Sequence, residues 1–546
     1  PLPWAGDVQT RVASSLGNSI FVASYLIMAI PPTLSRLLNA MRAILKEEEI
    51  GWGNTILAAV YIFILAVDVI AVIFSGSRGP MLGLLAGMFF FVFLGLLLIH
   101  RQRDPAQTLT VRSVGTSLVE VVVPLGIGGV AGAAAFAIFG PLTRGEVRYD
   151  HGALLALGIF GGFGLGILYL AVRVALSRGA WRLWLNWAML AVAMGAFLVA
   201  INVPTSPLHT VRDAPVVGRL AQLFQSGEGT GKVRALIWEG VLNLITLDEP
   251  LGIPGQYTDS LYRLRPLIGY GPESMFNAFA RVYPAELAHI EARGSSADRS
   301  HNETFDFVAM LGVIGFAAYY WLIFGLFYYL LKVVGWLPDA SARRRLIVLL
   351  ALGGQAGAVL PRLVAGSFVF SAVALPAGMI VMVFVHLVWQ AITHRPAVVA
   401  AVAEGAGAAS LDDEDQIPAT TSASTANEAS HGLAHLGPTG QGLVMIGILA
   451  ALIAHFVEVH FVFSIAATYV YFWVYAGLVV AWLWGRFRTD PSGDLATAGD
   501  GGAVAEAMAA PRPAAPGGRE PRRRRRSRST GAAASPQSSA SRAQPR

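Results

Sequence analysis

Apolar residues fall in runs of about 20 along most of the chain, separated by short polar turns. A run of that length is what an α-helix needs to cross about 30 Å of hydrocarbon. The pattern therefore predicts an all-α integral membrane protein, a polytopic helical bundle with about eleven spans and one large external loop. The expected spans are roughly 16–34, 54–75, 80–99, 118–140, 152–175, 183–203, 304–333, 344–362, 368–392, 441–459 and 462–485.

Polar stretches divide these runs into groups. Residues 204–303 contain aromatic residues, apolar stretches and about as many acids as bases, so we expect a folded loop, and loops of that length are usually functional. Residues 393–440 are rich in Ala, Ser, Thr and Asp without an apolar period, which predicts a flexible linker. Residues 486–546 predict a disordered basic tail. Membrane helices then occupy 1–203, 304–392 and 441–485.

Composition supports the membrane interpretation. Of 546 residues, 55% are hydrophobic and only 14% are charged, which is too little charge to cover the surface of a soluble protein of this length. The absence of cysteine excludes disulfides and thiolate metal sites. Much of the positive charge lies in the tail, at Arg522 to Arg526 and Arg528, where contact with anionic membrane lipids is favoured over binding to nucleic acid.

Basic residues gather in alternate loops. If the amino terminus lies outside, most of the Lys and Arg of the short loops fall inside, as cytoplasmic loops require. The loop at 204–303 is then predicted to be external, and the linker and tail cytoplasmic. The inside residues are Arg36, Arg42, Lys46, Arg101, Arg103, Arg112, Arg173, Arg178, Arg182, Lys332 and Arg343 to Arg345.

The predicted external loop ends in Arg299-Ser300-His301-Asn302-Glu303, directly before a span. Ser300 and Glu303 have the S-x-x-E spacing of a capping box, so we expect a helix to begin here. The amino terminus of a helix favours an anion such as a diphosphate. A neutral His can also take a proton from a sugar hydroxyl near neutral pH. The alternative is that His301 merely helps to cap an interfacial helix.

Motifs on the predicted external face occur in a recognisable order. His301-Asn302 is followed after nine residues by Gly312-Val313-Ile314-Gly315, and other motifs precede it. Together they resemble the O-antigen ligase and O-antigen polymerase family of membrane glycosyltransferases, whose signature includes H-N-x9-G-x-x-G. The other matching positions are Arg11, Ser14, Gly17 and Asn18, then Ser77-Arg78-Gly79, then Arg234 with Trp238, then Pro266 to Gly271 with Phe276.

Two features depart from the family pattern. The stretch between Trp238 and Pro266 is longer than usual and contains a second Pro250-Leu251-Gly252. Members of the family normally have several spans before the region of Arg11. Because the chain also begins at Pro1 without an initiator Met, we expect it to be a fragment of a larger protein.

The resemblance implies transfer of a glycan from an undecaprenyl-diphosphate carrier to an acceptor hydroxyl of a glycan, lipid or protein, outside the bacterial inner membrane. No cofactor is implied, and the sequence has neither a P-loop or dinucleotide fingerprint nor a convincing external metal site. Ligase, polymerase and protein O-glycosyltransferase are not distinguished.

The resemblance also implies roles for individual residues. His301 would be the general base, and Arg234 would hold the diphosphate through bidentate contacts. Arg78 would be a second phosphate contact, although an interfacial Arg often only extends toward the membrane surface. Trp238 would stack on a sugar, but a buried aromatic is the stronger interpretation. The supporting candidates are Asn302, Arg263, Arg265 and Arg299.

Two other classes of function stay open. A transporter or flippase predicts charged residues inside the spans, where Asp68 and Glu458 are nearly the only candidates, and it leaves the long loop unexplained. A non-catalytic membrane scaffold predicts no clustering of Arg and His on one face.

Overall fold

The computed structural model describes residues 14–46, 52–103, 110–139, 182–202, 229–253, 257–292, 294–393 and 441–483, with a few isolated positions besides. Its regular secondary structure is helical, apart from two strands of 2 residues each. It contains 7 helices that are long and apolar enough to cross a membrane, in agreement with the prediction of a helical membrane protein. The predicted span at 152–175 lies almost wholly outside the described residues, and the linker from residue 394 and the tail lie outside them.

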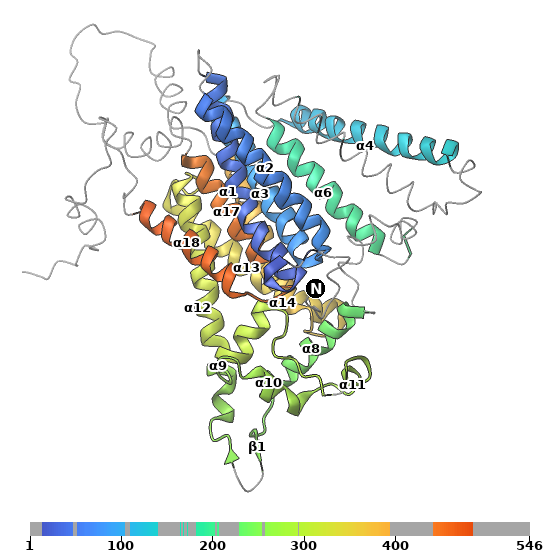
Figure 1. The fold of residues 1–546 in the computed structure, drawn as a ribbon, viewed down its shortest axis with the longest axis vertical. Helices are drawn as coiled ribbons and strands as arrows, with labels where there is room; N and C mark the ends of the chain where they lie inside the picture. Colours follow the sequence, from blue (N-terminus) through green and yellow to red (C-terminus); the bar gives the residue numbers. More distant parts are fainter. Residues whose placement is uncertain are drawn as a thin grey trace, which may run out of the picture. The chain divides into compact units, whose positions relative to one another are not determined.

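Every other predicted span overlaps a described helix. Apolar side chains dominate these helices because each must present a hydrophobic surface to lipid or to its neighbours. The long helices, shown in Figure 1, are α1 (Ser19–Lys46), α2 (Trp52–Ser75), α3 (Arg78–Arg103), α4 (Val111–Phe139), α6 (Leu183–Asn202), α12 (Glu303–Val333), α13 (Ala340–Ala365), α14 (Ser371–Thr393), α17 (Gln441–Glu458) and α18 (Ala466–Leu483).

Helix α17 packs between α1 and α3, although the chain places it far from both (Figure 1). Glycines on α3 allow the close approach. A β-carbon at Gly83 would lie 2.4 Å from the carbonyl oxygen of Ala454, and one at Gly87 would lie 2.5 Å from that of Ala450. Small residues at this spacing let two helices pack main chain to main chain, which is a principal source of helix association in lipid. The packing places the end of α17 beside the start of α3.

Helix α12 consists of two arms. Gly312 inside it has φ 65° and ψ −171°, which are not helical angles. The hydroxyl oxygens of Thr304 and Tyr320 lie 2.6 Å apart. In one straight helix, residues 16 positions apart would be separated by about 24 Å. The chain therefore folds back at Gly312, and the predicted span divides into a short arm (residues 303–311) and a main arm (residues 313–333).

The described residues between α6 and α12 form a smaller folded region around the short arm. Its core joins Trp238 and Val241 to Phe279, and to Phe305 of the short arm. The two strands pair antiparallel, with Gly252 opposite Thr258. The elements are α8 (Gly229–Ile245), β1 (Gly252–Ile253), β2 (Tyr257–Thr258), η5 (Tyr262–Leu264), α9 (Arg265–Ile268), α10 (Met275–Ala278), η6 (Phe279–Val282) and α11 (Leu287–Ile290).

The loop that follows α9 covers the break in α12. The backbone N–H groups of Tyr270 and Gly271 donate to the carbonyls of Ala309 and Met310 at 2.9 and 2.8 Å. Carbonyls at the end of a helical segment need partners from outside it, and this loop supplies them. The turn of α12 is therefore fixed by a segment that precedes it in the chain.

Candidate functional site

The start of α12 is capped by Asn302 and not by Ser300. The backbone of Asn302 is extended, and its side-chain oxygen accepts a hydrogen bond of 3.1 Å from the N–H of Phe305. The N–H of Glu303 donates to the carbonyl of Val459, so it is not bound by the Ser300 side chain. A helix begins here as predicted, but the predicted capping box is wrong, because a tertiary contact takes the group that the box would have used.

Asn302 also joins three parts of the bundle. Its side-chain NH₂ group donates to the carbonyl of His460 at 3.0 Å and to that of Ala372 at 3.3 Å. His460 lies in the turn between α17 and α18, and Ala372 lies in the first turn of α14. The side chain of Asn302 is fully buried. Its role as a substrate contact stays a prediction, while these contacts make it the residue that holds the motif in place.

His301 has a strained backbone between two anchored neighbours. Its φ is 56°, in the left-handed region that few residues other than glycine adopt. On one side, Ser300 donates its N–H to a carboxylate oxygen of Asp306 at 2.7 Å. On the other side lies Asn302, with the contacts above. Strain of this kind costs of order 1–3 kcal/mol and is concentrated at functional sites, where the surroundings enforce it.

Three predicted site residues come together from separate elements. Arg78 begins α3, Arg234 lies in the second turn of α8, and His301 directly precedes the cap of α12. Burial, and then the charge of Arg78, lowers the pKa of Arg234. The charge of Arg234 in turn lowers the pKa of His301. Charge therefore acts between Arg78 and Arg234 and between Arg234 and His301, which makes the three side chains one electrostatically connected group.

The imidazole of His301 is neutral at neutral pH. Burial, together with the charge of Arg234, lowers the pKa of His301 from 6.5 to about 4, against an opposing effect of Asp298. A neutral imidazole can accept a proton, but a pKa this low makes it a weak base while the Arg234 charge is not balanced. An anion bound beside Arg234 would offset that charge and raise the pKa of His301.

Arg234 and Arg265 differ in their partners. Among the residues that the structure describes, Arg234 makes no hydrogen bond or ion pair. Arg265 donates to both carboxylate oxygens of Asp259 at 2.8 and 2.9 Å, and to the carbonyl of Gly269 at 3.0 Å. Arg299 forms an ion pair with Glu273. Of these three arginines, Arg234 is therefore the one available to an anion, and Arg265 and Arg299 stabilise the loop.

Trp238 is a buried aromatic residue, as the stronger interpretation of the sequence has it. It is 5% exposed, and its indole N–H donates to the carbonyl of Ser300 at 2.9 Å. Its ring packs edge-on against Phe370, with centroids 6.0 Å apart. Because Trp238 lies one turn after Arg234, this contact holds α8 against the motif that contains His301.

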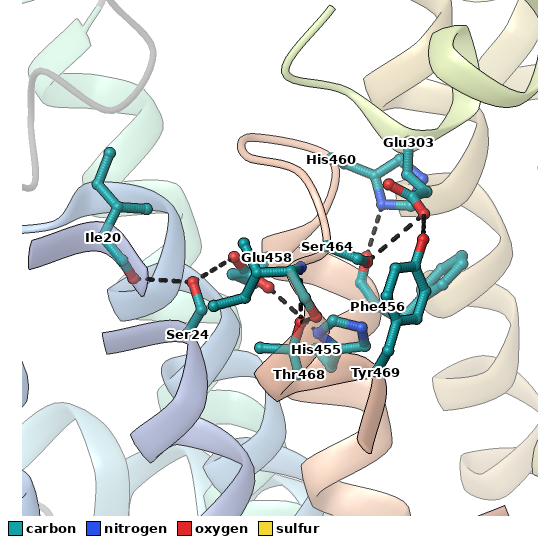
Figure 2. A network of polar contacts seen from close by, with 11 residues as sticks. Ile20, Ser24, Glu303, His455, Phe456, Glu458, His460, Ser464, Thr468 and Tyr469 are labelled. Carbon is teal, nitrogen blue, oxygen red and sulfur yellow. Dashed lines mark hydrogen bonds and ion pairs between the residues drawn. The ribbon is translucent and has the colours of Figure 1, made fainter. Parts of the chain in front are cut away.

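A buried polar network near the motif was not found from sequence (Figure 2). The hydroxyl of Ser24 donates to one carboxylate oxygen of Glu458 at 2.6 Å, and the other lies 3.2 Å from Nδ1 of His455. The hydroxyl of Tyr469 donates to Glu303 at 3.4 Å. Glu458 and Glu303 are 0% and 2% exposed. The one signal in the sequence was an acid inside an apolar run; Ser24 comes from α1, whereas His455 lies one turn before Glu458 on the same helix.

Comparisons with protein-family models, with curated proteins and with solved structures find no match for this chain. Among the described residues, no group of three or more His, Asp or Glu is arranged to hold a metal ion. The charged groups that the structure connects at this site are two arginines and a histidine. Two guanidinium groups beside a neutral imidazole form a place where an anion can bind next to a base.

Proposed function

We propose that this chain is a membrane glycosyltransferase of the O-antigen ligase or polymerase type. It moves a glycan from an undecaprenyl-diphosphate carrier to an acceptor hydroxyl at the external face of the bacterial inner membrane. The observation that carries the proposal is the electrostatic connection of Arg78 to Arg234 and of Arg234 to His301, which belong to three separate parts of the chain. The motif resemblance and the clustering of basic residues in alternate loops support the substrate class and the side of the membrane.

The arginines bind the donor. Guanidinium groups are permanently charged and offer paired N–H donors to phosphate oxygens. Arg234 lies partly buried, where a charge interacts more strongly with a bound anion than it would in water. As the bond between the anomeric carbon and the diphosphate breaks, negative charge grows on the leaving oxygen. Arg234 and Arg78 stabilise that charge.

His301 activates the acceptor. It accepts the hydroxyl proton while the acceptor oxygen forms its bond to the anomeric carbon and the diphosphate leaves with the electron pair. Donor binding prepares this step, because the diphosphate offsets the charge of Arg234 that helps to keep the pKa of His301 near 4. Base strength at His301 therefore increases when the donor is in place.

A transfer assay tests the proposal directly. The protein in membrane nanodiscs receives a defined lipid-linked glycan and a panel of glycan, lipid and protein acceptors. The expected result is an extended acceptor together with free undecaprenyl diphosphate, and loss of both products in His301→Gln. Donor binding without transfer to any acceptor class would contradict the catalytic proposal.

A second candidate function is favoured by one observation. Glu303 and Glu458 are buried acids between helices, and intramembrane ionisable groups often line the path of a transported ion or substrate. A transporter or flippase for a lipid-linked sugar would use them. It would move the lipid-linked sugar across sealed vesicles with no change in covalent structure, which separates it from the glycosyltransferase.

A further inference from the structure

The segment between β2 and α10 buries an ion pair and exposes aliphatic side chains, which is the opposite of the usual arrangement at a surface that faces water. Arg265 and Asp259 form an ion pair that is largely buried, with Asp259 only 3% exposed. A segment that faced water on its outer side would show charges there and keep aliphatic groups inside. Its outer side instead carries side chains that are 45, 47, 48 and 43% exposed, which are Leu261, Leu264, Leu267 and Ile268.

This apolar face continues onto the main arm of α12. Gly312 touches the main chain of Leu267, where a β-carbon would lie 2.2 Å away. The next residues, Val313 and Ile314, are 49% and 62% exposed. Ile314 and Trp321, which is 80% exposed, lie two helical turns apart and share one side of the arm.

An exposed apolar side of a helix in a membrane bundle lies against lipid. On α12 that side runs through Trp321 and Ile314 and reaches the turn at Gly312. Helix α9 packs against the same turn (Figure 1). The exposed apolar residues of α12 and those of residues 261–268 therefore lie next to each other where Gly312 touches Leu267.

We propose that residues 261–268 form an interfacial anchor that rests on the lipid bilayer at this end of the bundle. The four aliphatic side chains lie among the lipid head groups and the first carbons of the acyl chains. Arg263 is exposed beside them and donates to the hydroxyl of Tyr262 at 2.9 Å, which places a positive charge near lipid phosphates. A short amphipathic segment with this arrangement binds in the plane of an interface.

The occupant of the surface is phospholipid. The surface is continuous with a helix side that faces lipid, and the chain is already in the membrane, so contact requires no second molecule. The anchor gives the folded region around the short arm a second attachment to the membrane plane. This inference concerns the position of the loop and does not depend on the reaction that the protein performs.

Single cysteines can test the anchor in the chain of 546 residues, because this sequence contains none. Nitroxide labels are attached at Leu264→Cys and Leu267→Cys, with the protein in nanodiscs of phosphatidylethanolamine and phosphatidylglycerol. Trp321→Cys marks the lipid-facing side of α12, and Ser295→Cys marks an exposed position elsewhere in the same loop. Power saturation then compares collisions with oxygen, which enriches in lipid, with collisions with a water-soluble nickel chelate.

The expected ratio of oxygen to nickel collisions at residues 264 and 267 is several-fold higher than at residue 295 and lies toward the value at residue 321. Labels at 264 and 267 that meet the nickel chelate as often as the label at 295 would overturn the anchor. That outcome would indicate that the apolar side chains of residues 261–268 contact a protein partner and not lipid. Loss of the lipid signal at 321 would show that this variant is misfolded, in which case Ile314→Cys replaces it as the lipid-facing reference and the labels at 264 and 267 are judged by the same ratio.

Discussion

The main chains of Gly312 and Leu267 touch: a β-carbon on Gly312 would lie 2.2 Å from the carbonyl carbon of Leu267. Gly269 meets the main chain of Met310 in the same way, again at 2.2 Å. The motif from Pro266 to Gly271 and the motif that begins at Gly312 are therefore in direct contact, although they are separate in the sequence. The contact fixes the carboxyl-terminal end of the short arm (residues 303–311). His301 lies just before the other end of this arm, so the contact links the loop around Leu267 to the position of the candidate base.

Alanine at Gly312 or Gly269 should destabilise the protein strongly. Both glycines have positive φ, 65° and 70°, and both lack room for a β-carbon. Backbone strain of about 1–3 kcal/mol and overpacking of about 1–3 kcal/mol would combine. Thermal unfolding in detergent measures the loss. Gly325→Ala is the matched control on the main arm, because nothing lies within 4 Å of a β-carbon there. Equal effects at all three positions would contradict the contact.

Replacement of His301 by Ala or Gln should reduce transfer by about 10²–10⁴-fold, the usual contribution of a positioned proton acceptor. Binding of the lipid-linked donor should change much less, since arginines hold the diphosphate. Gln is informative because it can form a hydrogen bond but cannot accept a proton near neutral pH. His289→Gln, at an exposed position in α11, serves as the control. Near-normal transfer by His301→Gln would remove His301 from the mechanism.

Arg234→Ala should abolish transfer while the protein stays folded, and Arg234→Lys should restore only part of it, because Lys keeps the charge and loses the planar pair of donors. Transfer and donor binding are measured in parallel. Arg281→Ala removes an arginine whose side chain is 62% exposed and paired with Glu249, so little change is expected there. Full activity in Arg234→Ala would exclude Arg234 from donor binding.

The pKa of His301 should move in opposite directions in two variants. Burial and the charge of Arg234 lower this pKa to about 4, and Asp298 raises it. Arg234→Gln removes a cause of lowering, so the pKa should rise while burial still holds it below 6.5. Asp298→Asn removes the raising cause, so it should fall further. Titration of ¹³C-labelled histidine by NMR measures both pKa shifts, and the signal of His301 is assigned by its loss in His301→Gln. An unchanged pKa in either variant would show that His301 does not interact with the group that was replaced.

The sidedness of the bundle can be tested with the same cysteine-free background. Basic residues in alternate loops predict that residue 295 lies outside and the linker inside. In intact cells, a membrane-impermeant maleimide should label Ser295→Cys and should label Ser424→Cys only after the membrane is opened. Labelling of both positions, or of neither, before opening would contradict the predicted topology.

The sequence by itself determined the class of the protein. Runs of apolar residues predicted helices that the structure describes at every expected span except one, because the length of a membrane helix is set by local hydrophobicity and bilayer thickness. It also named Arg78, Arg234 and His301 as candidate site residues, and in the structure charge acts between Arg78 and Arg234 and between Arg234 and His301.

Only the tertiary structure decided how these pieces are used. It showed that α12 turns back at Gly312, that Arg265 pairs with Asp259, and that Trp238 is buried against the motif. It also revealed the buried partners of Glu458. The turn at Gly312, the burial of Trp238 and the bond from Ser24 to Glu458 depend on contacts between residues far apart in the chain, whereas Asp259–Arg265 and His455–Glu458 are local pairs that the fold buries. A local pattern of apolar and polar residues carries no information about which distant group will occupy a given donor or acceptor.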